Sequence, residues 1–128
     1  MPPWIDAAYD AADVAGVLAA LDAAGPDAAA AAATIRTRSA TSVAVTLRAL
    51  REAAASASLE ATLDREYRIA CAFLATPDYV EGIRAVVVDK DRRPRWAPAE
   101  HGSLTAQDVE RFFAPRPGDE LGLDAVYA

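Results

Sequence analysis

Hydrophobic residues recur at helical spacing through most of the chain. In the first such stretch, DAADVAGVLAALDAAG, the apolar positions are Val14, Val17, Leu18 and Leu21. This is the spacing of one face of an α-helix. Asp10, with Asp13 following it, suits an N-cap and an acidic first turn. Gly25 suits the position after the helix and Pro26 suits the first turn of the next, so the pattern predicts a tightly connected helical hairpin.

The second predicted helix, PDAAAAAATIRTR, consists mostly of alanine. Alanine is the best intrinsic helix former, but its side chain adds little apolar bulk for packing. We therefore expect this helix to lie close against a neighbour. The alanine run also fits a general bias in composition, and we assign no chemistry to it.

Two longer amphipathic helices follow. In SATSVAVTLRALREAAASA the predicted apolar face is formed by Val43, Leu47, Leu50 and Ala54. In SLEATLDREYRIACAFLATP it is formed by Leu59, Leu63, Tyr67, Ala70 and Leu74, with Thr62, Ile69 and Phe73 alongside. The Ser/Thr group at 39–42 and Ser58 are start signals, and Pro77 ends the second of these helices.

The pattern after Pro77 leaves two interpretations open. In DYVEGIRAVVVDKD the three consecutive valines at 86–88 are typical of a strand, whereas Val80, Ile83 and Val87 keep helical spacing. Periodicity alone does not decide between a strand and a helix here.

Turn signals dominate the C-terminal part of the chain. Pro94 and Pro98 bracket Trp96, which predicts an extended segment. Residues 105–108 read as a capping box that opens a short helix, and we expect this helix to continue through Phe113.

These elements predict an all-α fold class. We expect a small bundle of about five to six helices with an irregular Pro-rich C-terminal segment. A chain of 128 residues is about one domain. We place a single helical domain at residues 1–113 and a surface tail at residues 114–128.

Charge argues against nucleic-acid binding. The formal net charge is −6 and the sequence pI is about 4.7. Nucleic-acid affinity depends on clustered Lys and Arg, which release counterions from phosphates. The chain has one basic cluster, formed by Lys90, Arg92, Arg93 and Arg95. Asp89 and Asp91 partly cancel it, so we expect no nucleic-acid partner.

Cysteine usage and hydropathy indicate a cytoplasmic protein. Cys71 is the only cysteine, so an internal disulfide is impossible, and no Cys/His cluster could hold zinc. The N-terminus MPPWIDAAYD lacks the basic and apolar regions of a signal peptide, and no stretch is apolar enough to span a membrane. We therefore expect no membrane association.

No complete catalytic group of residues is visible. His101 lies beside Glu100 without a nucleophile nearby, and Cys71 has no neighbouring base to activate it. Ser56 and Ser58 resemble cap or turn residues. We assign no catalytic residue and no metal ligand from the residues alone.

Several separated blocks nevertheless share a pattern with one enzyme family. They are Glu66-Tyr67-Arg68, Asp78-Tyr79, Glu81-Gly82, Arg84-Ala85, Asp89-Lys90-Asp91 and Pro94-Arg95-Trp96. Together with VTLRALREA and LTAQDVERFF, their order and spacing resemble the C-terminal part of 3-hydroxyisobutyryl-CoA hydrolases, in the crotonase or enoyl-CoA hydratase/isomerase superfamily. WIDAAYDAADVAGVLAAL is similar to the preceding family segment, so the resemblance covers nearly the whole chain.

The resemblance carries expectations for fold and activity. It implies that residues 78–91 are mainly helical. In that superfamily an N-terminal α/β core binds the coenzyme A thioester and carries the oxyanion hole and acidic catalytic residues. A helical C-terminal region covers the site and forms subunit contacts. The chain resembles only this helical region, so we expect no hydrolase activity from it alone. The implied parent reaction is hydrolysis of 3-hydroxyisobutyryl-CoA in valine breakdown, with no metal or redox cofactor.

The resemblance also points to Lys90 and Arg92 as contacts for coenzyme A phosphates. The other interpretation is a solvated charged turn that ends the preceding helix. Trp96 is expected to act as a packing anchor. Two further roles stay open. One is a module that docks on a separately encoded crotonase core, which would leave a large apolar face exposed. The other is a remnant of a broken gene, pairing that face in a homo-oligomer.

Overall fold

The computed structural model describes residues 1–127, and its regular structure in this range is helical, without a strand. The elements are α1 (Trp4–Tyr9), α2 (Val14–Ala23), α3 (Pro26–Arg36), α4 (Ala40–Ala54), α5 (Leu59–Leu74), α6 (Pro77–Ile83), the π-helix η1 (Arg84–Val88), α7 (Ala106–Glu110) and α8 (Leu123–Tyr127). The predicted all-α class is confirmed, and the short helices α1 and α8 add to the bundle that was expected. Within residues 1–127, no helix is long and apolar enough to cross a membrane.

The first hairpin forms as predicted, but α2 begins later than expected. Asp13 is its N-cap, and its Oδ1 accepts a hydrogen bond from the Gly16 amide at 2.8 Å. The prediction that Asp10 caps this helix is wrong, because Asp10 ends α1. Gly25 has a φ of 110°, a left-handed conformation that favours glycine, and it joins α2 directly to α3.

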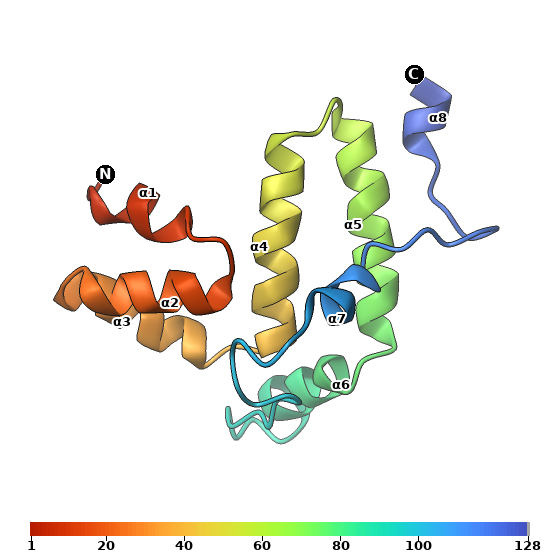
Figure 1. The fold of residues 1–128 in the computed structure, drawn as a ribbon. Helices are drawn as coiled ribbons and strands as arrows, with labels where there is room; N and C mark the ends of the chain where they lie inside the picture. The colour runs from red at the N-terminus through yellow and green to blue at the C-terminus, as the bar shows by residue number, and fades with distance from the viewer. Residues whose placement is uncertain (128) are drawn as a thin grey trace.

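The alanine-rich helix α3 lies close against α2, as expected. Ala28 and Ala32 are fully buried. Together with residues of α1 and α2 they form what we call the N-terminal cluster, whose buried members are Ala8, Val14, Val17, Leu18, Leu21, Ala28 and Ala32. Val43 and Leu47 of α4 pack against this cluster from the side. In Figure 1 these helices therefore lie beside α4 as a separate group.

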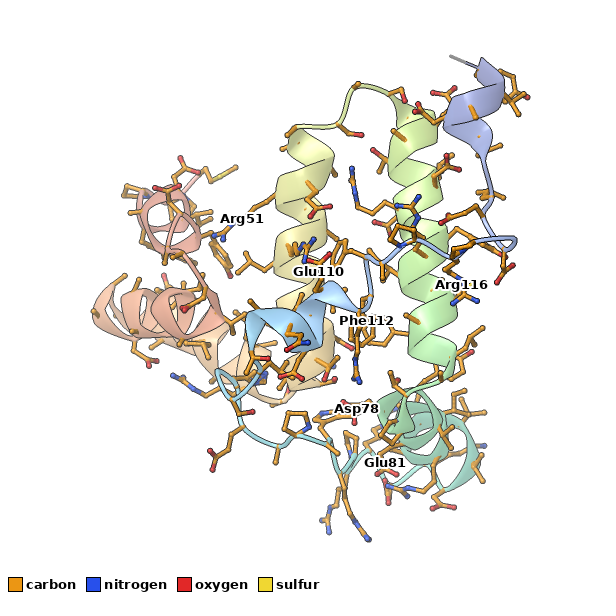
Figure 2. All side chains as sticks on the ribbon, turned by 45° about the vertical axis from the view of Figure 1, so that its right-hand side comes forward. Arg51, Asp78, Glu81, Glu110, Phe112 and Arg116 are labelled. Carbon is orange, nitrogen blue, oxygen red and sulfur yellow. The ribbon has the colours of Figure 1, made fainter. Side chains whose placement is uncertain are left out.

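The opposite face of α4 contributes to a second core. The C-terminal cluster comprises Val45, Ala49, Ile69, Phe112 and Phe113. Figure 2 shows Phe112 in the space between α4 and α5, two antiparallel helices joined by a short turn. The Phe112 ring centroid is 4.6 Å from that of Phe73 on α5. This aromatic contact fills the gap between the two long helices.

The predicted apolar faces of the long helices differ from the buried ones. Val43 and Leu47 contact the N-terminal cluster as expected, but Leu50 is 65% exposed. On α5 the expected stripe of Leu59, Leu63, Ala70 and Leu74 is exposed, and the buried side is the flank of Ile69 and Phe73 that was predicted alongside it. The reason is that α5 packs on this flank against the phenylalanines that follow α7.

The segment after Pro77 is helical, which confirms the expectation from the family resemblance. α6 continues into η1, and the Asp89 amide donates to the Arg84 carbonyl at 2.8 Å, closing a π-helical turn. The Arg92 amide then donates to the Ala85 carbonyl at 3.0 Å, which ends the helix. The strand interpretation of residues 86–88 is therefore wrong.

The C-terminal elements pack back onto the long helices. The predicted capping box is present, because Thr105 and Asp108 exchange side-chain and backbone hydrogen bonds. α7 ends at Glu110 and not at Phe113, since the chain there tightens into a turn. Beyond residue 114, the amide of Leu123 donates to Asp64 on α5 at 2.8 Å, so part of the expected surface tail is tied down as α8.

Candidate functional site

The strongest candidate for ligand contact is the segment at residues 89–97, which we call the basic loop. It presents four exposed cations, Lys90, Arg92, Arg93 and Arg95. Within residues 1–127, none of the four forms an ion pair. Lys90 and Arg92 have φ values of 59° and 56°. Residues other than glycine rarely adopt this conformation, and such strain persists only where the surroundings hold it.

Arg84 organises the base of this loop. Its guanidinium pairs with both carboxylate oxygens of Glu81, at 2.8 and 2.9 Å. The same group binds Asp89 at 2.6 Å and Asp91 at 2.8 Å, and donates to the Arg93 carbonyl. Arg84 thus binds both acids that partly cancel the basic cluster, but its single charge balances only one of the three carboxylates. The four cations of the loop are exposed to solvent and still outnumber the two carboxylates left unbalanced.

The electrostatics of Glu81 reflect this network. The Arg84 guanidinium, helped by the Arg95 amide that donates to Glu81 Oε1 at 2.8 Å, lowers the pKa of Glu81 to about 2. The same pairing raises the pKa of Arg84. Both groups are therefore ionised near neutral pH, where this pairing can form.

A second set of contacts ties the basic loop to the helical frame. Asp78 is 5% exposed; its Oδ2 accepts from the Ser39 hydroxyl at 2.5 Å and its Oδ1 from the Ala97 amide at 2.8 Å. The Trp96 indole donates to the Thr37 carbonyl at 2.9 Å, in keeping with the expected packing role of Trp96. The loop is thus anchored at the start of α4, and Figure 2 shows Asp78 and Glu81 close together at its base.

An exposed apolar surface lies next to the basic loop on α6 and η1. We call it the apolar ridge, and its members are Val80, Ile83, Val86, Val87 and Val88. Their exposed fractions run from 42% to 68%. This is the helical stripe that was visible in the sequence, but within residues 1–127 nothing covers it. Contiguous exposed apolar side chains of this kind mark interaction surfaces.

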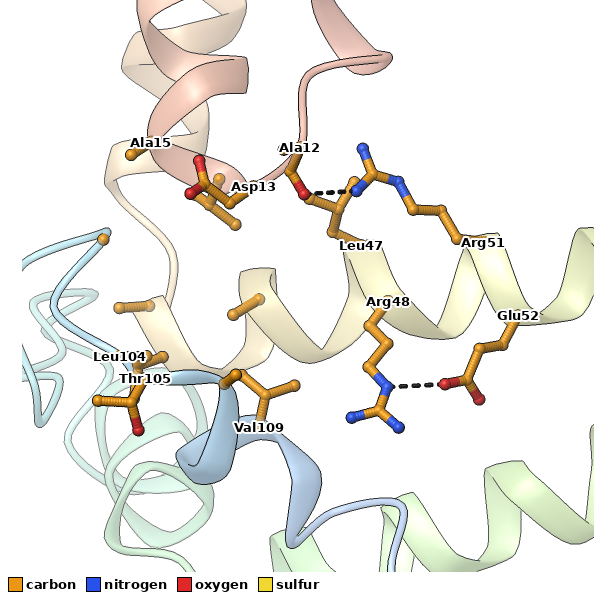
Figure 3. Close-up of a pocket in the computed structure, with 15 residues that line it drawn as sticks. Ala12, Asp13, Ala15, Leu47, Arg48, Arg51, Glu52, Leu104, Thr105 and Val109 are labelled. Carbon is orange, nitrogen blue, oxygen red and sulfur yellow. Dashed lines mark hydrogen bonds and ion pairs between the residues drawn. The ribbon is translucent and has the colours of Figure 1, made fainter.

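A pocket of about 430 Å³ lies between α2, α4 and α7 (Figure 3). Its polar wall is already satisfied by the chain itself. Arg48 pairs with Glu52 at 2.7 Å and with Glu110 at 2.6 Å. Arg51 donates to the Ala12 carbonyl at 2.8 Å. These arginines join α4 to α7 and to the end of α1, so the pocket is better explained as an opening between packed elements than as a reactive centre.

The remaining sequence candidates do not assemble into a catalytic group. His101 Nε2 is buried and lacks a hydrogen-bond partner within residues 1–127, and burial, aided by the Arg36 charge, lowers its pKa. Cys71 is half-buried on α5. Ser58 caps α5 as predicted. The part of the chain that the structure describes holds no group of three or more His, Cys, Asp or Glu placed to bind a metal.

Asp78 and Arg84, which hold the basic loop, were visible in the family blocks of the sequence, but the sequence did not indicate this role for them. Asp78 lies 39 positions from Ser39 and 19 from Ala97. No local pattern predicts partners at such separations. Arg84 could have been found, because a Glu three positions before an Arg on a helix is a known stabilising pair. The Lys90 and Arg92 side chains are exposed as a contact role requires, but their binding stays a prediction.

The chain matches a known family over most of its length. The family model described as enoyl-CoA hydratase/isomerase matches residues 1–113. The 3-hydroxyisobutyryl-CoA hydrolase, mitochondrial, of Gallus gallus is 40% identical over 70% of this chain and 23% of its own length. The Homo sapiens protein of the same name is 38% identical over 68% of this chain and 22% of its own length.

Solved structures show the same relationship. A carnitinyl-CoA dehydratase from Mycobacterium thermoresistibile has a TM-score of 0.83 and 46% identity, over 91% of this chain and 33% of its own. An enoyl-CoA hydratase from Rhodobacter sphaeroides has a TM-score of 0.79 and 34% identity, over 87% of this chain and 33% of its own. The chain thus spans about a third or less of the proteins it matches. With a family model covering most of its residues, it belongs to the enoyl-CoA hydratase/isomerase family.

Proposed function

We propose that the chain is the helical C-terminal region of a 3-hydroxyisobutyryl-CoA hydrolase-like enzyme, and that it works only together with a crotonase-type catalytic core. The observation that carries this proposal is the apolar ridge. The family resemblance predicts an uncovered face where a core packs, and the ridge has that character. The other two thirds of the matched structures would supply such a core.

The proposed parent reaction is hydrolysis of a short 3-hydroxyacyl-CoA thioester to the free acid and coenzyme A, as in valine breakdown. Water attacks the thioester carbonyl, and negative charge develops on its oxygen. Removing one donor from an oxyanion hole costs about 10²–10³ in rate. Residues 1–127 offer no catalytic group of their own, so the chain alone should be inactive. The chemistry calls for neither a metal nor a redox cofactor.

Within this proposal the basic loop supplies charge for substrate binding. Lys90 and Arg92 are exposed, unpaired within residues 1–127, and held in fixed backbone conformations. Preorganised cations lose less freedom on binding an anion than mobile ones do. These two side chains would contact coenzyme A phosphates once the ridge is seated on a core.

The names of the vertebrate relatives place those proteins in mitochondria. A cytoplasmic location for the present chain remains a proposal from its own sequence. Expression of the full reading frame with a C-terminal fluorescent tag, followed by fractionation, would decide between the two compartments.

Reconstitution with a core tests the function. The chain would be mixed with the core segment of the Gallus gallus hydrolase, and coenzyme A release from 3-hydroxyisobutyryl-CoA would be followed with a thiol reagent. We expect no release by the chain alone and clear release by the mixture. Val87→Asp should abolish coenzyme A release by the mixture, because it places a charge in the apolar ridge. Val126→Asp, at a valine that is 72% exposed on α8, is the matched control and should retain it.

Two results would overturn the proposal. One is coenzyme A release by the pure chain. The other is a mixture whose activity is unaffected by Val87→Asp, since the ridge would then have no part in docking.

The alternative is a stand-alone module that docks on a separately encoded core or associates with itself. The same ridge would serve this role. The coding region upstream of Met1 distinguishes the two proposals. A crotonase-like reading frame joined to this one would support the proposal that the chain is part of one enzyme. Its absence would support a separate module.

A further inference from the structure

A groove of about 410 Å³ in the N-terminal half of the chain has no part in the proposed function. We call it the α4 groove, because half of the residues that line it lie on α4. Its volume lies in the range of about 300–1,000 Å³ that is usual for small-molecule sites. Among the described residues, no member of the apolar ridge or of the basic loop lines it. Besides the ring of Tyr9, its apolar side chains are Val14, Val17, Ile35, Val43, Leu47 and Leu50.

The polar groups of the α4 groove gather toward the start of α4. Arg38 lies just before this helix, and Ser42 lies in its first turn. Thr46 and Leu50 follow Ser42 at four-residue intervals, so the three positions share one face of α4. Along this face the lining changes from a guanidinium and two hydroxyl groups to an apolar side chain. Small-molecule sites commonly combine apolar walls with a few polar groups of this kind, which fix the orientation of the ligand.

Arg38 is a cation without an acidic partner. Its side chain is exposed, and in the described part of the chain it forms no ion pair. Arg36 nearby is already paired with Asp22 at 2.5 Å. Arg51, beside Leu50, donates to three backbone carbonyls and does not line the groove. The free guanidinium in the lining therefore favours an anionic ligand, and its planar set of donors matches a carboxylate.

We propose that the α4 groove binds an aliphatic carboxylate of medium chain length, with its carboxylate at Arg38 and its chain along α4 toward Leu50. The dimensions agree with this occupant. From Ser42 to Leu50 the helix advances about 12 Å, at 1.5 Å per residue. Three consecutive bonds in trans geometry span about 3.8 Å, so an extended chain of about ten carbons covers this distance.

The size of the groove also argues against a protein helix as its occupant. With its side chains, a helix is about 10–12 Å wide, and a segment as long as the groove is about 12 Å long. Such a segment exceeds a volume of 410 Å³. A single aliphatic chain is narrow enough to lie between the apolar walls, while its charged end stays at the exposed guanidinium. This inference goes beyond the proposed function and uses none of its residues.

Binding should depend on both ends of the ligand. Each methylene that the groove buries should tighten binding by up to about fourfold. The contact with Arg38 should add less, about two- to fivefold, because the side chain is exposed and water screens its charge. Decanoate should therefore bind more tightly than octanoate, and a higher salt concentration should weaken the binding of both.

Isothermal titration calorimetry of the full chain with decanoate and with decyltrimethylammonium, a cation of the same chain length, tests the charge preference. The unmodified chain should bind decanoate more tightly. Arg38→Gln should weaken decanoate binding about two- to fivefold. Arg38→Glu should reverse the preference, so that the cation binds more tightly than decanoate. Arg38 is exposed, so the circular dichroism of both variants should match that of the unmodified chain.

Two controls locate the site. Arg93→Gln removes an exposed cation of the basic loop and should leave decanoate binding unchanged. Leu50→Asp, at a leucine that is 65% exposed in the groove, should weaken decanoate binding, whereas Leu59→Asp, at a leucine that is 68% exposed on α5, should not. In amide nuclear magnetic resonance spectra, decanoate should shift the signals of residues that line the groove and not those of the apolar ridge.

Four results would overturn the proposal. They are no binding of decanoate at millimolar concentration, equal losses in Arg38→Gln and Arg93→Gln, an Arg38→Glu variant that still prefers decanoate, and signal shifts confined to the apolar ridge. Because the proposed function depends on the ridge and the basic loop, it is tested separately by the reconstitution with a core. Failure of one proposal is thus distinguishable from failure of the other.

Discussion

Replacing Phe112 by alanine should remove much of the stability of the domain. The side chain is 1% exposed and lies between α4 and α5. Its ring meets the Phe73 ring at a centroid distance of 4.6 Å, and the Arg111 guanidinium carbon lies 5.0 Å from its centroid.

The expected loss is large compared with the total stability. A buried Phe→Ala change costs about 3–5 kcal/mol, of which about 0.5–1.5 reflects the aromatic pair. A domain of this size is stable by about 5–15 kcal/mol. The loss corresponds to a fall in Tm of about 15 °C. Phe112→Leu keeps an apolar side chain but loses the aromatic pair, so it should cost less than Phe112→Ala.

Urea unfolding followed by circular dichroism measures the effect. The midpoint should fall for Phe112→Ala while the slope m stays unchanged, because the folded surface is the same. Leu59→Ala, at an exposed leucine, should stay within about 0.5 kcal/mol of the unmodified chain. A loss below about 1 kcal/mol for Phe112→Ala would show that the ring does not hold α4 and α5 together.

Three further outcomes follow from individual side chains. Asp78→Ala leaves the Ser39 hydroxyl and Ala97 amide without their acceptor, and should cost about 1–3 kcal/mol in urea unfolding. The pKa of Glu81 is about 2 in the folded chain against 4.5 in the unfolded one, so its contribution to stability is complete above about pH 4.5 and is lost as the pH falls toward 2. Glu81→Gln should therefore reduce the loss of stability at acid pH, measured as the urea midpoint against pH. An unchanged acid loss would contradict this. Burial lowers the pKa of His101, so the unfolded state binds a proton at this residue more readily than the folded state. The urea midpoint of unfolding should therefore fall as the pH drops through 6.5. His101→Gln should remove that fall.

The sequence predicted the long helices because their signals are local. Ser39 and Ser58 cap α4 and α5, and Gly25 takes the left-handed turn that its position suggested. α1 and α8 are too short for periodicity to identify them. The buried face of α5 was predicted only in part: Ile69 and Phe73 were placed beside the apolar stripe, but the residues that cover them come from beyond α7, and no local pattern shows their direction of approach.

The candidate site was predictable only in part. The basic residues of the loop were visible, but the sequence also showed Asp89 and Asp91 beside them. Their pairing with Arg84 requires the π-helical turn, which brings the three side chains together. The uncertainty between strand and helix at 86–88 has a physical cause as well, since the apolar stripe of α6 and η1 has no partner within the described chain to define its buried side.

The division of the hydrophobic core across α4 determines an order of assembly during synthesis. The N-terminal cluster is complete once α4 has left the ribosome, because its members end at Leu47. The C-terminal cluster needs Phe112 and Phe113. At about 5–20 residues per second, Val45 and Ala49 therefore lack these two phenylalanines for several seconds after they are made. During this interval the nascent chain carries one finished core and one incompletely covered apolar face, the kind of surface that favours aggregation.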